Sequence, residues 1–152
     1  MRLSVGKKAA VLFASLVLMA LAADSVSTAA PPPPNPVLVF IGPEYYEASG
    51  KQWIRYRYTV ENFAAYPNEL FTAAPALPPC GQNTKAARTW VDVYDQSGKR
   101  LNGFCAFGSH NDLNKIWFAG EVDAVPPSWV YIELNDRQTS TKYKSNLAET
   151  AL

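Results

Sequence analysis

The sequence predicts an all-β domain built as an antiparallel sandwich, and three observations support this fold class. From Val37 onward, apolar side chains recur at every second residue in short runs, which is the period of a half-buried strand. Turn-forming residues separate the runs, and only 24–30 and the last few residues hint at helix. The chain has 152 residues, 48% of them apolar, which suits one packed core and argues against disorder. We expect about seven strands in a domain spanning 37–147.

The first 23 residues have the features of a secretory signal peptide. Arg2, Lys7 and Lys8 precede a 15-residue apolar run from Ala9 to Ala23, which contains small residues near its end. A membrane-spanning helix needs about 20 apolar residues, so this run is short for an anchor. We expect cleavage, no transmembrane anchor afterwards, and a secreted product in an extracellular or periplasmic space.

A Pro-rich lead is expected over 24–36, with four consecutive prolines at 31–34 and another at Pro36. Such a segment is extended, either as a stiff spacer or as an unstructured mature N-terminus. The chain has 14 basic and 13 acidic residues. Removal of 1–30 takes away three basic residues and one acidic residue, which leaves 11 basic and 12 acidic residues. This near-neutral balance gives no reason to expect a nucleic-acid partner.

The strands follow from alternation, taken in chain order. Ile54, Tyr56, Tyr58 and Val60 share one face of their run, and polar residues occupy the other. The polar sequence from Asp95 to Lys99 then predicts a hairpin turn. In a later run, Val130, Ile132 and Leu134 are expected to point inward. The expected strands are 36–42, 54–61, 90–94, 100–107, 116–119, 128–135 and 141–146.

The two cysteines, Cys80 and Cys105, are expected to form one disulfide after export. Closing this loop of 25 positions would stabilise the fold by about 3 kcal/mol in the chain-entropy model. Cys80 lies in a long Pro-rich loop at 64–88. This loop either covers an open end of the sandwich, with Tyr66, Leu70, Phe71 and Leu77 as plugs, or presents a rigid surface.

Common catalytic and metal sites find little support in the residues. His110 is the single histidine, and no serine lies in a Gly-x-Ser-x-Gly motif. One histidine and two paired cysteines do not make a zinc site. We therefore predict no catalytic, metal or cofactor-binding residue. Pairs of carboxylates remain open as a glycosidase-like alternative, drawn from Glu121, Asp123, Glu133 and Asp136.

Four aromatic residues, on the opposite strand faces from the aliphatic positions, form the candidate binding face. Such side chains can make a platform for a sugar or a protein, or can pack as a secondary core under the long loop. The residues are Trp90, Tyr94, Trp129 and Tyr131.

Two segments resemble immunoglobulin-like and fibronectin type III domains. The segment 128–146, preceded by Val125-Pro126-Pro127, resembles the last two strands of that family through Pro127, Tyr131 and Tyr143-Lys144-Ser145-Asn146. The run 54–62 is similar to an early strand of secreted adhesion-type sandwiches. The resemblance implies an immunoglobulin/fibronectin III-like sandwich and assigns no binding residue.

These observations lead to three expectations of function. The first is a secreted, non-enzymatic domain that binds an unidentified protein or carbohydrate. The second is a secreted hydrolase inhibitor that uses the Pro-rich loop 64–88, and the third is a structural domain of a cell-envelope assembly.

Overall fold

The computed structural model describes residues 31–74, 80 and 86–151, and eight strands lie in this part of the chain. Three short 3-10 helices, η1 (Phe63–Ala65), η2 (Asn68–Phe71) and η3 (His110–Asn114), accompany them. The strands are β1 (Leu38–Ala48), β2 (Lys51–Val60), β3 (Thr89–Asp95), β4 (Arg100–Phe104), β5 (Ile116–Glu121), β6 (Trp129–Asp136), β7 (Thr141–Lys144) and β8 (Ala148–Glu149).

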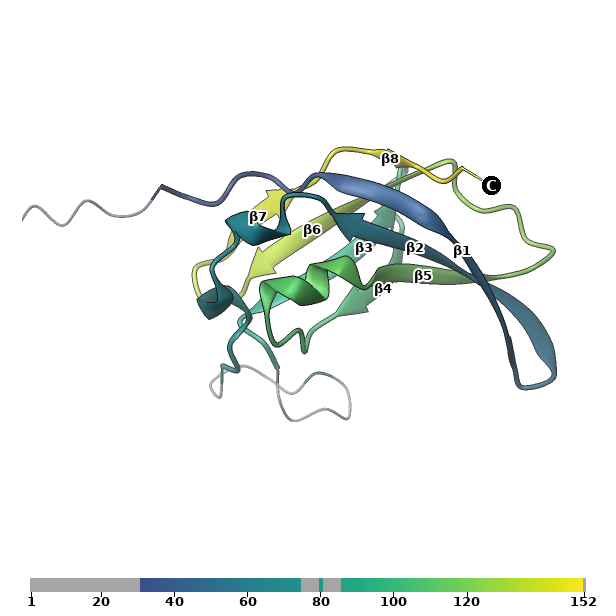
Figure 1. The fold of residues 1–152 in the computed structure, drawn as a ribbon, viewed down its shortest axis with the longest axis horizontal. Coiled ribbons are helices and arrows are strands. Elements are labelled where there is room, and N and C mark those ends of the chain that lie inside the picture. Colours follow the sequence, from purple (N-terminus) through teal and green to yellow (C-terminus); the bar gives the residue numbers. More distant parts are fainter. Residues whose placement is uncertain (1–30, 75–79, 81–85, 152) are drawn as a thin grey trace, which may run out of the picture. The chain divides into compact units, whose positions relative to one another are not determined.

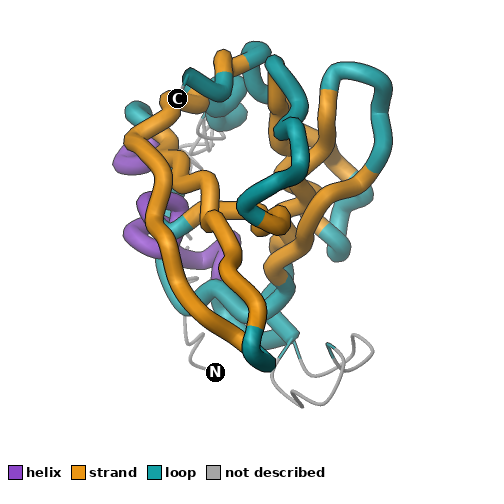
Figure 2. The backbone as a smooth tube through the Cα atoms, turned by 90° about the vertical axis from the view of Figure 1, so that its right-hand side faces the viewer, coloured by secondary structure: helices purple, strands orange, loops and turns teal. Residues whose placement is uncertain are grey.

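The strands form two antiparallel sheets (Figure 1). One has the order β1-β2-β5, and the other has the order β4-β3-β6-β7, with β8 also pairing with β6. Figure 2 shows strands on both sides of the domain interior. A disulfide joins Cys80 to Cys105. The expected all-β antiparallel sandwich with one disulfide is confirmed.

The first and last strands differ from expectation. β1 was expected to end at Gly42 but continues to Ala48. A bulge between Phe40 and Gly42 shifts the register, and the pairing with β2 continues beyond it. Gly42 has a φ of 130°, which glycine tolerates, and Pro43 lies on an edge strand that needs fewer backbone donors. β7 ends at Lys144, and β8 lies beyond residue 147, so the sandwich extends past its expected end.

The core lies between the sheets and comes from the expected inward positions. Tyr56 and Tyr58 of β2 are buried against Phe118 of β5, and Val130, Ile132 and Leu134 line the opposite layer. Burial raises the pKa of Tyr58 to about 12, although its hydroxyl lies 2.6 Å from that of Thr150.

Asn146 joins the two sheets at one edge. Its side-chain oxygen accepts a hydrogen bond from the Leu38 backbone nitrogen at 2.8 Å, and its amide nitrogen donates to the Leu38 carbonyl at 3.0 Å. Leu38 begins edge strand β1, whereas Asn146 lies between β7 and β8 of the other sheet. One amide thus satisfies both backbone groups of a core residue.

A buried ion pair fixes the turn after β6. Asp136 is 2% exposed, and it accepts hydrogen bonds from Arg88 Nε at 2.8 Å and Arg88 Nη2 at 2.6 Å. The same carboxylate accepts from the Gln138 backbone nitrogen and the Thr139 hydroxyl. The Arg88 hydrogen bonds, aided by these two donors, lower the pKa of Asp136 to about 2.

The long loop is anchored at its described ends. Tyr66, Leu70 and Phe71 are buried in the core, as the plugs were expected to be, while Leu77 lies outside the described residues. An isolated bridge pairs Ala73 with Ala87. No helix in the described ranges has the length and apolar character that crossing a bilayer requires.

Candidate functional site

The structure brings together two of the four aromatics of the candidate binding face. Tyr94 of β3 lies opposite Tyr131 of β6, and the rings stack with centroids 5.2 Å apart. The Lys144 ammonium lies 4.0 Å from the centre of the Tyr131 ring, which is 9% exposed as a residue. Tyr131 therefore packs within the outer face and offers little surface to a ligand.

The two tryptophans of that set lie apart from one another. Trp90 is four residues, or about 13 Å, from Tyr94 along β3. Its indole nitrogen donates to the Ala87 carbonyl at 3.0 Å, and the Arg137 guanidinium lies 4.5 Å from its ring centre. Trp129 is 41% exposed at the start of β6. Two ion pairs cross the sheet between these ends, Arg100–Asp92 and Lys142–Glu133, so the four aromatics do not form a continuous platform.

The carboxylates considered for catalysis have different surroundings. Glu133 lies on the outer face of β6 with Lys142, whereas Asp136 has the phase of the inward residues and binds Arg88. These two carboxylates therefore do not face a common substrate position. In the described residues, no group of three or more His, Cys, Asp and Glu side chains is placed to hold a metal ion.

His110 has a structural contact. Its Nδ1 atom lies 2.8 Å from the Tyr66 carbonyl oxygen, and its backbone nitrogen donates to the side chain of Asn68. The neighbouring Ser109 backbone nitrogen donates to Asp112 at 3.3 Å. These contacts connect η3 to η1 and η2 at one end of the sandwich.

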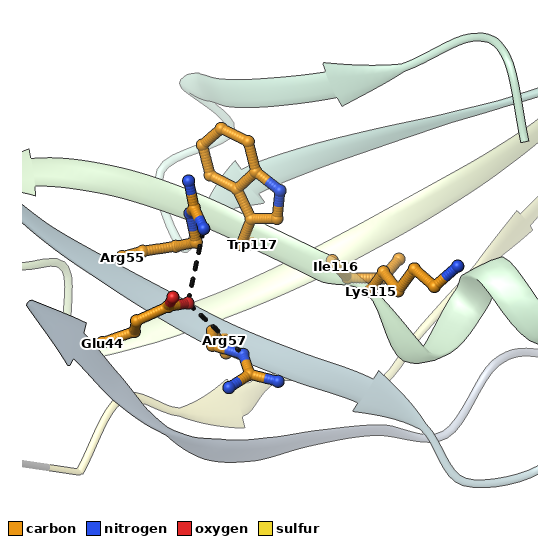
Figure 3. A pocket seen from close by; sticks show the side chains of 6 residues that line it. All are labelled: Glu44, Arg55, Arg57, Lys115, Ile116 and Trp117. Carbon is orange, nitrogen blue, oxygen red and sulfur yellow. Dashed lines mark hydrogen bonds and ion pairs between the residues drawn. The ribbon is translucent and has the colours of Figure 1, made fainter. Parts of the chain in front are cut away.

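A different cluster lies on the outer face of the β1-β2-β5 sheet (Figure 3). Alternation along β2 sends Tyr56 and Tyr58 into the core, so Arg55 and Arg57 between them point outward. Strand pairing places Glu44 beside Arg55 and Trp117 beside Arg57. These residues line an open depression of about 290 Å³, together with Lys115 and Ile116. We call this set the arginine depression.

Arg55 is held between two aromatic rings. Its guanidinium carbon lies 5.0 Å from the ring centre of Tyr46 and 4.6 Å from that of Trp117. Trp117 is itself fixed, because its ring meets Phe104 edge-on and its carbonyl accepts a hydrogen bond from Asn102. Cation–π contacts use the faces of a guanidinium, so they leave its in-plane N–H groups available for hydrogen bonding.

The two arginines share one weakly held carboxylate. Glu44 lies between them, with its Oε2 atom 3.4 Å from Arg55 Nη1 and 3.8 Å from Arg57 Nε (Figure 3). A charge-assisted N–H···O bond is normally about 2.7–2.9 Å long, so both contacts are loose. Arg55 Nε is buried without a hydrogen-bond partner among the described residues. A guanidinium carries five N–H donors, so this pair has donors left over, although the buried Arg55 Nε is not one that a ligand from solvent can reach.

The remaining cation of the depression is partly neutralised. Lys115 Nζ lies 2.8 Å from a carboxylate oxygen of Asp112, and the Lys115 side chain is largely exposed. The Lys115 and Gly108 contacts oppose desolvation and lower the pKa of Asp112 below its usual value. Three cations against two carboxylates leave the depression and its border with an excess positive charge.

The arrangement suits an external oxyanion. Planar guanidinium groups bind carboxylate, sulfate or phosphate through paired donors, and a pre-positioned arginine loses less side-chain entropy on binding. This cluster was not among the predicted site residues. The alternation Arg55-Tyr56-Arg57-Tyr58 does place two arginines on one face, but their relation to Glu44 and Trp117 depends on strand pairing.

Comparison of the chain with protein-family models, curated proteins and solved structures finds no match.

Proposed function

We propose that the chain is a secreted, non-enzymatic binding domain that recognises an extracellular glycan or protein through the outer face of the β1-β2-β5 sheet. The observation that carries this proposal is the arginine depression. It combines two outward guanidinium groups, a loosely held internal carboxylate and aromatic supports that fix one arginine in place. The signal-like segment 1–23 and the disulfide support export.

The topology supports an immunoglobulin/fibronectin III-like assignment within the broad sandwich class. If β1, β2, β3, β5, β6 and β7 are labelled A, B, C, E, F and G, the neighbours A-B-E and C-F-G are those of immunoglobulin domains. The fourth strand, β4, lies beside C instead of beside E. This placement favours the fibronectin type III-like arrangement. The binding role is proposed from the site and not from the fold, because one fold can host many functions.

Binding screens with matched variants test the proposal. The purified chain is presented to arrays of glycans and extracellular proteins, together with Arg57→Gln and Arg137→Gln. Both substitutions remove one arginine charge, but Arg137 stacks on Trp90 in the other sheet's surface. We expect Arg57→Gln to lose binding and Arg137→Gln to retain it.

Two results would contradict the proposal. Retained binding in Arg57→Gln, together with loss in Trp129→Ala, would place the function on the other sheet. Failure of every array ligand to bind would favour the alternative of a structural domain in a cell-envelope assembly.

Inhibition of a hydrolase is the second candidate, favoured by the anchoring of loop 64–88. The Ala73–Ala87 bridge and the Cys80–Cys105 disulfide constrain this segment, although residues 75–79 and 81–85 lie outside the described ones. Constraint lowers the entropy lost when a loop enters an enzyme cleft. Replacing Pro75-Ala76-Leu77 with glycines should abolish inhibition of a target hydrolase while preserving the circular dichroism spectrum. Unchanged inhibition would reject this role for the loop.

A further inference from the structure

The ligand chemistry of the arginine depression follows from the group that already lies in it. The Glu44 carboxylate is within 4 Å of nitrogens of both Arg55 and Arg57, so a carboxylate fits between the two guanidinium groups. Its contacts are long, and the Glu44 side chain is 45% exposed. An exposed ion pair of this kind contributes little stability, so its replacement by an external carboxylate costs little.

The donors around Glu44 are better arranged for a second carboxylate than for Glu44 itself. Arg57 is 50% exposed and has a single ion pair in the described residues, at 3.8 Å. Arg55 is less mobile because Tyr46 and Trp117 flank its guanidinium. A ligand arriving from solvent is not restrained by strand β1 and can approach both groups at normal hydrogen-bond length.

The composition of the depression favours a polysaccharide over a protein surface. Protein interfaces have an apolar, aromatic core. The apolar residues that line the depression are Ile116, which is fully buried, and Trp117, which packs against Arg55 and Phe104. The volume of about 290 Å³ is at the small end for ligand pockets and suits one sugar unit.

The surface also continues along the same sheet. Ala119, between Trp117 and Glu121 on the outward side of β5, presents a small side chain next to Arg55. A second open depression follows, lined by Lys51, Gln52, Glu121, Val122 and Asp123. Its two carboxylates outnumber its one lysine, which pairs with Glu121 at 2.8 Å, so this second depression does not attract an acidic ligand. The charged contact of such a ligand is therefore confined to the arginine depression.

We infer that the arginine depression binds an acidic polysaccharide through a sugar carboxylate that displaces Glu44 from Arg55 and Arg57. This inference rests on the proposed binding function and names the class of ligand for the same site. Glu44 acts as an internal competitor, since it occupies the position that the ligand carboxylate takes.

Affinity measurements on a panel of four ligands test the inference. Isothermal titration calorimetry uses oligogalacturonate, its methyl ester, dextran sulfate and poly-glutamate at the same ionic strength. We expect oligogalacturonate to bind and its neutral ester not to bind. Dextran sulfate and poly-glutamate should bind less tightly, because the first lacks carboxylates and the second lacks sugar rings.

Three variants test the roles of the residues. Arg57→Gln should weaken binding of oligogalacturonate about tenfold, since a hydrogen bond to a charged group is lost. Arg55→Lys keeps the charge but loses the planar fork, and should weaken binding by a similar factor. Glu44→Gln should strengthen binding about threefold to tenfold, because the internal competitor loses its charge. Arg137→Gln is the control, and melting temperatures verify the fold of each variant.

The outcomes separate this inference from the proposed function. Tighter Arg57-dependent binding of dextran sulfate or poly-glutamate would overturn the carboxylated sugar while leaving the binding face in place. Weaker or unchanged binding in Glu44→Gln would overturn displacement of Glu44. Binding of oligogalacturonate that is insensitive to Arg55 and Arg57, or no binding of any panel member, would overturn the inference.

Discussion

Replacing Asp136 by asparagine should remove a pH-dependent part of the domain's stability. The hydrogen bonds from Arg88 lower the pKa of Asp136 from 3.8 to about 2 in the folded chain. One pKa unit corresponds to about 1.4 kcal/mol, so the ionised group contributes about 2 kcal/mol at neutral pH. Because the folded pKa is the lower one, this stability is present above pH 3.8 and is lost as the pH falls through 2.

Urea unfolding of the intact chain at several pH values between 7 and 2 measures this effect. The difference in unfolding free energy between the original chain and Asp136→Asn should shrink by about 2 kcal/mol over that range. Asp123→Asn is the matched control, since Asp123 is exposed in the loop after β5. A difference that stays constant with pH would refute the assignment of the low pKa to the Arg88–Asp136 pair.

Two further predictions concern the connections that hold the sheets and the long loop. Asn146→Ala should destabilise the fold by about 2 kcal/mol in urea unfolding, because both backbone groups of Leu38 lose their hydrogen-bond partner. A loss below about 0.5 kcal/mol would contradict this role of Asn146. Replacing Cys80 and Cys105 together by serine should cost about 3 kcal/mol by the same measurement, because the bridge restricts the unfolded chain. Equal stability in the presence and absence of the bridge would contradict this contribution.

The strands were predictable because alternation is a local property of the sequence. Tyr56 and Tyr58 were placed inward by their spacing with Ile54 and Val60, and all four are buried. The disulfide was predictable because two cysteines allow one intramolecular pairing. Gly42 was mistaken for the end of a strand, since a bulge and an ordinary strand end favour the same residue type.

The arrangement of the surface was less predictable because it depends on pairing across the sheet. Alternation predicted that Trp90, Tyr94, Trp129 and Tyr131 lie on outward positions. It did not predict the ring stacking or the ion pairs among them. Glu44, Arg55 and Trp117 come together from three strands, and the register that aligns them is a long-range property. The partnership of Arg88 with Asp136 across 48 positions has no local signal either.

Mapping of chemical-shift changes by nuclear magnetic resonance tests the central claim most directly. Oligogalacturonate is titrated into the isotope-labelled chain while side-chain N–H signals are followed. We expect the largest changes at Arg55 Nε, Arg57 Nε and the Trp117 indole nitrogen, with the Trp90 and Trp129 indoles unchanged. Changes concentrated at the Trp90 and Trp129 indoles, or none at either sheet at saturating ligand, would contradict a binding site on the β1-β2-β5 face.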